Sequence, residues 1–395
     1  MRPLEGIKVL ELGQLIAGPF ATKILGEFGA EVIKIEPPKT GDPLRKWRLL
    51  HEGTSVWWAS QSRNKKSVTV DLRSAEGQAI IRRLVQEVDI LVENFRPGAL
   101  EGWGLGEEQL KEINPDLIMV RISGYGQNGP YKDLPGFGLV GEAMAGFRHL
   151  SGEPGRAPVR VGISIGDSLA ALHAVIGALM ALRHREVQRG SGQVIDIALY
   201  ESVFNMMESL VAEYSVFGEV RQPAGSSLPG ITPSNAYLCA DGKYALIAGN
   251  GDSIFKRLML LIGREDIAND PAFTHNDGRS AEAEYIDGVI AQWTAQHSLG
   301  EVLEALHENR VPAGRVYDVE DIFNDPHYKA REMLLEGELE DGTAVTLPGV
   351  LPKLSQTPGK VVRKAPILGQ DTDEVLSAIG FSAEELAHLR KQDVI

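Results

Sequence analysis

The feature that most constrains the fold is a regular alternation of strand-like and helix-like segments over the first 200 residues. The expected strands are short apolar runs at 7–12, 31–36, 67–72, 89–93, 117–122 and 194–198. Expected helices lie between them at 18–28, 75–87, 107–112 and 169–182. Strands that alternate with helices predict a parallel sheet with helices on both faces, which is the doubly wound α/β class.

The first unit of this pattern, residues 1–36, has the order of a dinucleotide site without its glycine fingerprint. Gly13 and Gly18 are separated by the bulky Leu15 and Ile16, where the motif requires G-x-G-x-x-G. We therefore expect the doubly wound topology without a nicotinamide function.

The character of the chain changes after residue 220. Segment 221–234 (RQPAGSSLPGITPS) is rich in Pro, Gly and Ser and predicts a linker. We expect a large α/β domain from residues 1–220 and 330–395, and a linker with a small α+β domain at 221–329. Further expected elements are strands at 236–239 and 244–248 and helices at 199–217, 253–262, 281–296, 299–308 and 382–392.

Composition and charge exclude several classes of function. The 395 residues are 43% apolar and 24% charged, which is typical of a soluble globular protein, and the net charge of −14 with no basic face argues against nucleic acid or an anionic membrane as a partner. Cys239 is the only cysteine, and the nine histidines lack metal-binding spacings, so we expect neither disulfides nor a metal site. An expected strand begins within ten residues of Met1, so we expect no signal or transit peptide and a cytoplasmic location.

Asp167 stands where the run V-G-I-S-I-G (161–166), expected to be strand-like, meets an apolar helix. That helix is too short to span a bilayer, so it is expected to be buried. An Asp in this place is most often an N-cap that accepts hydrogen bonds from the first turn. Alternatively, a carboxylate at a helix N-terminus stays ionised at neutral pH and can act as a nucleophile, approached across Gly162 and Gly166. Spacing alone leaves both roles open.

Two segments offer candidate contacts for phosphate. Asn94, Phe95 and Arg96 follow the strand at 89–93, and loops at the carboxyl ends of parallel strands are where α/β folds bind ligands. An aromatic ring and a guanidinium there suit a nucleotide, although an ordinary Pro-Gly turn is the alternative. The basic run S-R-N-K-K-S (62–67) is either a phosphate contact or a solvated edge.

Two glycine-rich loops are candidates for a catalytic role. The loop at 124–130 has no Lys or Ser/Thr in P-loop register, which excludes a nucleoside triphosphatase of that type. Gly249, Asn250 and Gly251 follow the strand at 244–248 and form either a tight turn or a mobile loop whose N–H groups cover a reacting carbonyl.

Taken in order, these segments resemble the class III CoA-transferases, the family of the formyl-CoA:oxalate and carnitine CoA-transferases. The resembling motifs run along nearly the whole chain, at 3–12, 17–22, 29–36, 63–68, 92–98, 114–118, 124–130, 161–167 and 366–372. The resemblance implies that CoA is a substrate rather than a tightly bound cofactor, and that the fold is an interlocked, ring-shaped homodimer, which a long linker at 221–234 would suit.

The resemblance also implies roles for individual residues. Asp167 would attack an acyl-CoA thioester and then carry CoA as an aspartyl thioester. The residues expected to contact CoA are Ile16, Ala17, Val70, Arg73, Asn94, Phe95, Arg96 and Phe137. The loop Gly249, Asn250 and Gly251 would close over the intermediate. An Arg that binds CoA in the oxalate enzyme falls at Pro37 here, and the candidates to replace it are Arg45 and Lys39.

The segments around 135–141 and 161–171 resemble the branch that uses succinyl-CoA as donor and four- or five-carbon dicarboxylates as acceptors. Two alternatives remain. The same fold carries 2-methylacyl-CoA racemases, whose reaction needs a His in segment 134–141; that segment has none, and the nearest is His149. A non-catalytic CoA-binding protein, with Asp167 as a helix cap, is the other.

Overall fold

The computed structural model describes residues 1–395, which form two compact units. The first unit comprises residues 1–147, 161–213 and 327–395, and the second comprises residues 148–160 and 214–326. Both units are therefore built from segments that are separated in the sequence.

A six-stranded parallel sheet lies at the centre of the first unit. Its strands are β1 (Lys8–Glu11), β2 (Glu31–Glu36), β5 (Lys65–Thr69), β6 (Ile90–Glu93), β7 (Ile118–Ser123) and β8 (Val194–Ala198), in the order β5-β2-β1-β6-β7-β8. The predicted parallel α/β sheet is confirmed. The strand order reverses between β1 and β6, and in open α/β sheets ligands bind at the carboxyl edge beside such a reversal.

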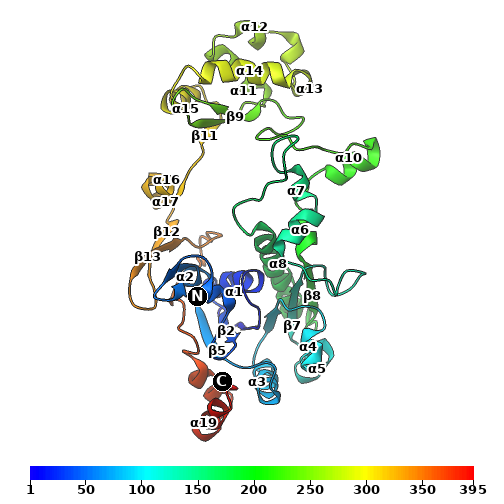
Figure 1. Ribbon diagram of the computed structural model, residues 1–395, viewed down its shortest axis with the longest axis vertical. Helices are drawn as coiled ribbons and strands as arrows, with labels where there is room; N and C mark the ends of the chain where they lie inside the picture. Colours follow the sequence, from blue (N-terminus) through cyan, green and yellow to red (C-terminus); the bar gives the residue numbers. More distant parts are fainter. The chain divides into compact units, whose positions relative to one another are not determined.

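Helices cover both faces of this sheet. One face packs against α3 (Ala75–Val85), α5 (Glu107–Ile113), α18 (Thr372–Ala378) and α19 (Ala383–Lys391). On the other face, α1 (Ala17–Glu27) and α8 (Ile165–Gln188) lie side by side (Figure 1). Each face of the sheet has its own hydrophobic core, and adjacent strand residues point to opposite cores. Leu10 belongs to the core on the first face and Val9 to the core on the second. A sheet buried on both faces explains why neighbouring residues of β1, β6 and β7 are apolar.

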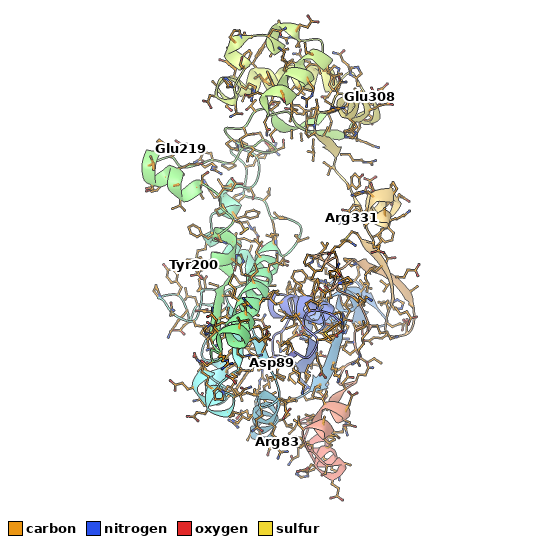
Figure 2. The ribbon with its side chains drawn as sticks, turned by 180° about the vertical axis from the view of Figure 1, so that it is seen from behind. Arg83, Asp89, Tyr200, Glu219, Glu308 and Arg331 are labelled. Atoms are coloured by element: carbon orange, nitrogen blue, oxygen red, sulfur yellow. The ribbon has the colours of Figure 1, made fainter.

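The C-terminal residues return to this unit and complete it. The Ser67 N–H of β5 donates to Asp371 Oδ2 at 2.8 Å. The Arg83 guanidinium of α3, labelled in Figure 2, lies 4.3 Å from the ring centroid of Phe381, between α18 and α19. The smaller elements of the unit are η1 (Pro43–Lys46), β3 (Leu50–His51), β4 (Thr54–Ser55), α2 (Val56–Gln61), α4 (Ala99–Gly102), α6 (Gly138–Met144), α7 (Phe147–Leu150), α17 (Pro326–Ala330), β12 (Leu334–Glu338) and β13 (Ala344–Pro348), of which α7 and α17 lie at its borders.

Helix α8 differs from the prediction in its start and in its burial. No strand precedes it, because the helix already begins at Ile165. Its Ala-rich face, including Ala170, Ala174 and Ala178, is buried, whereas Leu172, Ile176, Leu179 and Met180 on other faces are 41–67% exposed. By length and composition alone α8 could cross a membrane, a test that core helices of soluble proteins also pass. The expectation of an all-round buried helix is therefore wrong.

The second unit contains a three-stranded antiparallel sheet in the order β11-β10-β9. Its elements are β9 (Ser234–Leu238), β10 (Tyr244–Ala248), α11 (Asp252–Leu261), α12 (Glu265–Ala268), η2 (Pro271–Phe273), α13 (Asn276–Ala281), α14 (Ala283–Thr294), α15 (Leu299–Glu308), β11 (Ala313–Arg315) and α16 (Val319–Asn324). Tyr237, Phe255, Ile290 and Val302 contribute to a core between the sheet and its helices. The strand pair predicted at 236–248 is confirmed.

One helix predicted as continuous is divided. The segment 199–217 forms α9 (Leu199–Phe204) and α10 (Leu210–Phe217), and between them Glu208 has a positive φ of 51°, which a helix does not allow. This break is not marked by Gly or Pro, so the pattern of residues contains no signal for it. The helix predicted at 281–296 is confirmed as α14, which begins after its N-cap Glu282.

Candidate active site

Asp167 is the third residue of α8 and not its N-cap. The N-cap position belongs to Ser164, whose side chain makes no capping hydrogen bond. The interpretation of Asp167 as an N-cap is therefore wrong. A carboxylate in the first turn of a helix is still close to the unpaired N–H groups and the positive end of the helix dipole, which favour its ionised form.

The carboxylate of Asp167 lies against the first residue of α6. A Cβ added to Gly138 would overlap Oδ2 of Asp167, and a Cβ added to Gly166 would lie 3.2 Å from the Gly138 carbonyl oxygen. The glycines therefore let α6 and α8 approach closely at the carboxylate. Gly166 serves this packing, whereas Gly162 faces open space. Of the two glycines predicted to admit a ligand, only Gly162 has room beside it.

We expect Gly138→Ala to impair the chemistry of Asp167 without affecting ligand affinity. The added methyl group must displace the Asp167 carboxylate, and misplacement by about 1 Å can cost about 10²-fold in turnover. Steady-state kinetics of the CoA transfer that the resemblance implies would measure the loss of turnover. Gly300→Ala, near the start of α15 with open space around the added Cβ, is the matched control and should retain wild-type turnover. Equal activity of both variants would contradict the prediction.

A cavity of about 960 Å³ lies at the carboxyl edge of the parallel sheet, formed by the segments that follow β1, β2, β5 and β6. Its cations and aromatic rings are Lys46, Arg73, Arg96, Trp47, Phe95 and Trp103. It lies beside the reversal of strand order, where the topology predicts a ligand. Aromatic faces and several cations in one cavity suit a nucleotide with phosphate groups.

The structure brings together four of the residues predicted to contact CoA, because Val70, Arg73, Phe95 and Arg96 all line this cavity. Asn94 does not line it. Its Oδ1 accepts the Gln14 N–H at 2.7 Å and its Nδ2 donates to the Gln14 carbonyl at 2.9 Å. Asn94 therefore joins the loop after β6 to the loop after β1.

The remaining predicted contacts lie outside the cavity lining. Ile16 and Ala17, at the start of α1, are 8% and 2% exposed, so only small parts of them are accessible. Phe137 is 69% exposed and directly precedes Gly138, which lies against Asp167. Of these three residues, Phe137 presents the largest surface to a ligand.

Lys46 is a cavity cation that the sequence analysis missed. Of the two candidates to replace the Arg at Pro37, Arg45 is 5% exposed and donates to both Glu36 oxygens at 2.8 and 2.9 Å. Lys39 pairs with Asp393 and is not among the cavity residues. Lys46 lines the cavity at the end of η1. Asp42 and Pro43 at the start of η1 are a sequence signal for a helical turn, but they do not place that turn at the cavity.

A fully buried ionic network lies beneath the loop after β1. Lys34 Nζ contacts Glu11 Oε1 at 2.8 Å, Asp42 Oδ2 at 2.8 Å and the Gly13 carbonyl at 2.9 Å. Burial alone would raise the pKa of Glu11, but Lys34 and Lys65 outweigh it and hold that pKa at about 2. Asp42 also accepts the N–H of Leu15, whose φ is +63°. The network therefore fixes the shape of this loop.

The basic run at 62–67 is not a surface for phosphate. Arg63 and Lys65 are both 0% exposed; Arg63 pairs with Glu27, and Lys65 pairs with Glu11 Oε2 at 2.9 Å. Their partners are far away in sequence, so a local pattern could not reveal the pairing. No group of three His, Cys, Asp or Glu side chains in residues 1–395 is arranged to hold a metal ion.

The predicted loop Gly249, Asn250 and Gly251 belongs to the second unit and connects β10 to α11. The fully buried Arg279 donates to the Asn250 carbonyl at 2.6 Å, and the Gly249 N–H donates to the Pro233 carbonyl at 3.0 Å. The loop is thus tied at two points to its own unit. Its closure over a reacting carbonyl stays a prediction.

Comparison with known proteins identifies the family. A model described as CoA-transferase family III matches residues 4–372. Succinyl-CoA–D-citramalate CoA-transferase of Chloroflexus aurantiacus is 47% identical over 396 residues, which cover 100% of this chain and 98% of that protein. The succinyl-CoA–L-malate CoA-transferase alpha subunit of the same organism is 42% identical, with 100% of this chain and 92% of that protein covered.

Comparison with solved structures supports the same family. A CAIB/BAIF family protein from Brucella suis has a TM-score of 0.84 and 33% identity, with 96% of this chain and 99% of that chain covered. These matches span nearly the whole chain and confirm the resemblance seen in its motifs. The chain belongs to CoA-transferase family III.

Proposed function

We propose that the protein transfers CoA from succinyl-CoA to a four- or five-carbon dicarboxylate through a covalent thioester on Asp167. The observation that carries the proposal is the position of the Asp167 carboxylate, in the first turn of α8 against the bare backbone of Gly138. The donor and the acceptor class are supported by the relatives whose names specify succinyl-CoA with D-citramalate or L-malate.

The proposed reaction is an exchange of acyl groups that balances without a co-reactant. The Asp167 carboxylate attacks the thioester carbonyl and the C–S bond breaks. CoA is released as the thiolate, and a mixed anhydride of Asp167 and succinate remains. The thiolate attacks the Asp167 carbonyl, succinate leaves, and an aspartyl thioester remains. The acceptor carboxylate then attacks the aspartyl thioester, which releases the thiolate and forms a second mixed anhydride. The thiolate attacks the acceptor carbonyl of this anhydride, which gives the new acyl-CoA and regenerates the Asp167 carboxylate. Covalent catalysis of this kind divides one difficult exchange into easier steps.

The cavity beside β1 and β6 is proposed to hold the nucleotide half of CoA. Trp47 and Phe95 offer aromatic faces, and Lys46, Arg73 and Arg96 offer positive charge to phosphate groups. Ile16, Ala17 and Phe137 are proposed to contact the remaining part of CoA, and Asn94 to shape the site through Gln14. The loop at 249–251 is proposed to cover the intermediate.

We expect Lys46→Met to weaken acyl-CoA binding. Loss of one charge-assisted contact to phosphate raises KM for succinyl-CoA about tenfold and leaves kcat nearly unchanged, because Lys46 would bind substrate and transition state equally. The matched control is Lys39→Met, which removes the same charge from an exposed residue paired with Asp393. Similar KM values for the two variants would mean that Lys46 does not contact CoA.

The proposed chemistry is tested by trapping the intermediate. The protein is incubated with succinyl-CoA without acceptor and then treated with hydroxylamine or borohydride, and the modified residue is found by mass spectrometry. Modification at Asp167 is expected. A protein that transfers CoA but is modified elsewhere, or nowhere, would refute the mechanism. Deuterium entering the α-carbon of a 2-methylacyl-CoA from solvent would instead indicate the racemase.

A homodimer is proposed as the working form. The exposed apolar side chains Leu172, Ile176, Leu179 and Met180 of α8 lie within three turns of one helix, and apolar patches of this kind commonly mark protein interfaces. The occupant we propose is a second copy of the chain. Sedimentation equilibrium should give twice the chain mass of 42.9 kDa, whereas the mass of one chain would refute the proposal.

A further inference from the structure

We infer that Glu93 and Arg121 are positioning residues that hold one wall of the CoA cavity in place, and that acyl-CoA binding weakens when Glu93 takes up a proton. The inference deepens the proposed function, since it rests on the binding of CoA in this cavity. It concerns the segment from Glu93 to Trp103, which supplies Phe95, Arg96, Ala99 and Trp103 to the cavity lining.

Glu93 fixes the start of this segment. It is the last residue of β6 and is 1% exposed. Its Oε2 accepts the backbone N–H of Phe95 at 2.7 Å, and its Oε1 accepts Nε of Arg121 at 2.8 Å. Each oxygen of the ionised carboxylate therefore accepts from a donor, and the first of these bonds directly sets the turn that carries the Phe95 ring.

Arg121 fixes the other end of the segment. It lies on β7 in register with Glu93 and is 5% exposed. Its Nη1 and Nη2 donate to Oε1 and Oε2 of Glu101 in α4 at 2.7 and 3.2 Å. One guanidinium thus joins the carboxylates at both ends of the segment. The two ends of the segment also contact each other directly. The ring centroids of Phe95 and Trp103 lie 5.2 Å apart in an edge-to-face arrangement.

A proton on Glu93 would weaken this arrangement. Burial raises the pKa of Glu93 to about 7, with Glu101 adding to the rise and Arg121 and the Phe95 N–H opposing it. A protonated carboxyl group has no charge and carries a hydroxyl on one oxygen, which accepts a hydrogen bond more weakly than a carboxylate oxygen does. Because both oxygens face N–H donors, protonation weakens the hydrogen bonds that hold the turn and the guanidinium.

The charged groups around Glu93 come from several elements. Arg121 faces it from β7 and Glu101 from α4, Arg96 lies on the same loop, and Asp196 of β8 is in register with Arg121. One Arg between Glu93 and Glu101 leaves this triad with one uncompensated negative charge, which favours uptake of a proton.

The sign of the pH effect follows from the raised pKa. Above about pH 7 Glu93 is ionised and holds the wall. Below about pH 7 its hydrogen bonds weaken, so KM for acyl-CoA rises as the pH falls from 8 to 6. The effect of Glu93 on folding stability has the opposite pH dependence. Because its pKa is higher in the folded chain than in the unfolded chain, Glu93 contributes more to stability at pH 5 than at pH 8. Weaker binding at pH 6 is therefore not a sign of unfolding.

The test compares KM for succinyl-CoA and kcat of the full-length protein between pH 6 and 8. Wild type should show KM rising about fivefold toward pH 6 with little change in kcat, the effect of one hydrogen bond. Glu93→Gln cannot ionise, and its amide NH₂ would face either the Phe95 N–H or the Arg121 guanidinium, so that two donors would oppose each other. This variant should have the raised KM at every pH. Titration of the ligand's own phosphate affects all variants alike and cancels in the comparison.

Two further variants keep the inference falsifiable if Glu93→Gln does not fold. Glu101→Gln leaves Glu93 paired with Arg121 but removes a charge that raises the Glu93 pKa, so the rise in KM should move to lower pH. Glu107→Gln removes an exposed carboxylate paired with Lys111 and should leave the profile unchanged.

An unshifted profile in Glu101→Gln, or a normal KM that still varies with pH in Glu93→Gln, would overturn the inference. If Lys46→Met nevertheless raises KM, the CoA site stands and only the role of Glu93 is wrong. If Lys46→Met has no effect either, the placement of CoA in this cavity fails as well, while the trapping experiment still decides the chemistry of Asp167.

Discussion

Asp167→Ala is expected to lose CoA transfer by about 10³-fold or more, the largest effect we predict for any single substitution. The methyl group cannot attack a thioester or carry CoA, and removing a covalent nucleophile has effects of at least this size in other enzymes. Asp167→Asn, with nearly the same shape, should be equally inactive. Neither variant should form an adduct with succinyl-CoA.

The control for this prediction is Ser168→Ala, at the next position of α8. Ser168 Oγ donates to the Ser164 carbonyl within the helix, so its loss should leave transfer nearly unchanged. CoA affinity, measured by titration calorimetry, should be the same in Asp167→Ala as in wild type, because the proposed nucleotide cavity is formed by other residues. Substantial transfer by Asp167→Ala would refute the covalent mechanism.

Lys34→Met is expected to have the largest effect on stability, about 3–5 kcal/mol in the free energy of unfolding. The substitution leaves the carboxylates of Glu11 and Asp42, 0% and 1% exposed, without the ammonium group that contacts both at 2.8 Å. Urea unfolding followed by far-UV circular dichroism would measure this loss of stability.

The matched control removes a lysine of the same sheet from a surface ion pair. Lys8 pairs with Glu87 at 3.7 Å with both side chains at least 43% exposed, so Lys8→Met should change stability by no more than about 1 kcal/mol. Equal losses in the two variants would mean that the network around Lys34 contributes no more than an exposed pair.

The sheet could be predicted from sequence because its strands are buried on both faces. The run Ile90–Glu93 is apolar at all but its last position, and the structure places it within one residue of the prediction. The largely polar β5 ends three residues before the end of the strand predicted at 67–72. The division of the helix at Glu208 could not be predicted in the same way. There the backbone leaves the helix at a residue with no conformational preference for doing so.

The candidate site shows the same limit. Phe95, Arg96 and Arg73 could be placed from their positions just after strands, because the carboxyl ends of parallel strands share one edge. Lys46 could not, because the path of residues 37–47 depends on Arg45 and Asp42 bonding to Glu36, which is a tertiary contact. Likewise, Arg63 and Lys65 looked exposed because their acidic partners come from α1 and β1.

The return of the C-terminal residues to the first unit has a consequence for synthesis on the ribosome. Strand β5 at the edge of the sheet is bonded to Asp371, and α3 is covered by the segment that carries Phe381. The residues that line the cavity all precede residue 104, yet the unit that contains them is completed only when residues 327–395 have emerged. The second unit, whose last residue is 326, can thus finish folding first although it begins later in the chain. A nascent chain that stalls near its end would hold a folded second unit and an open first one.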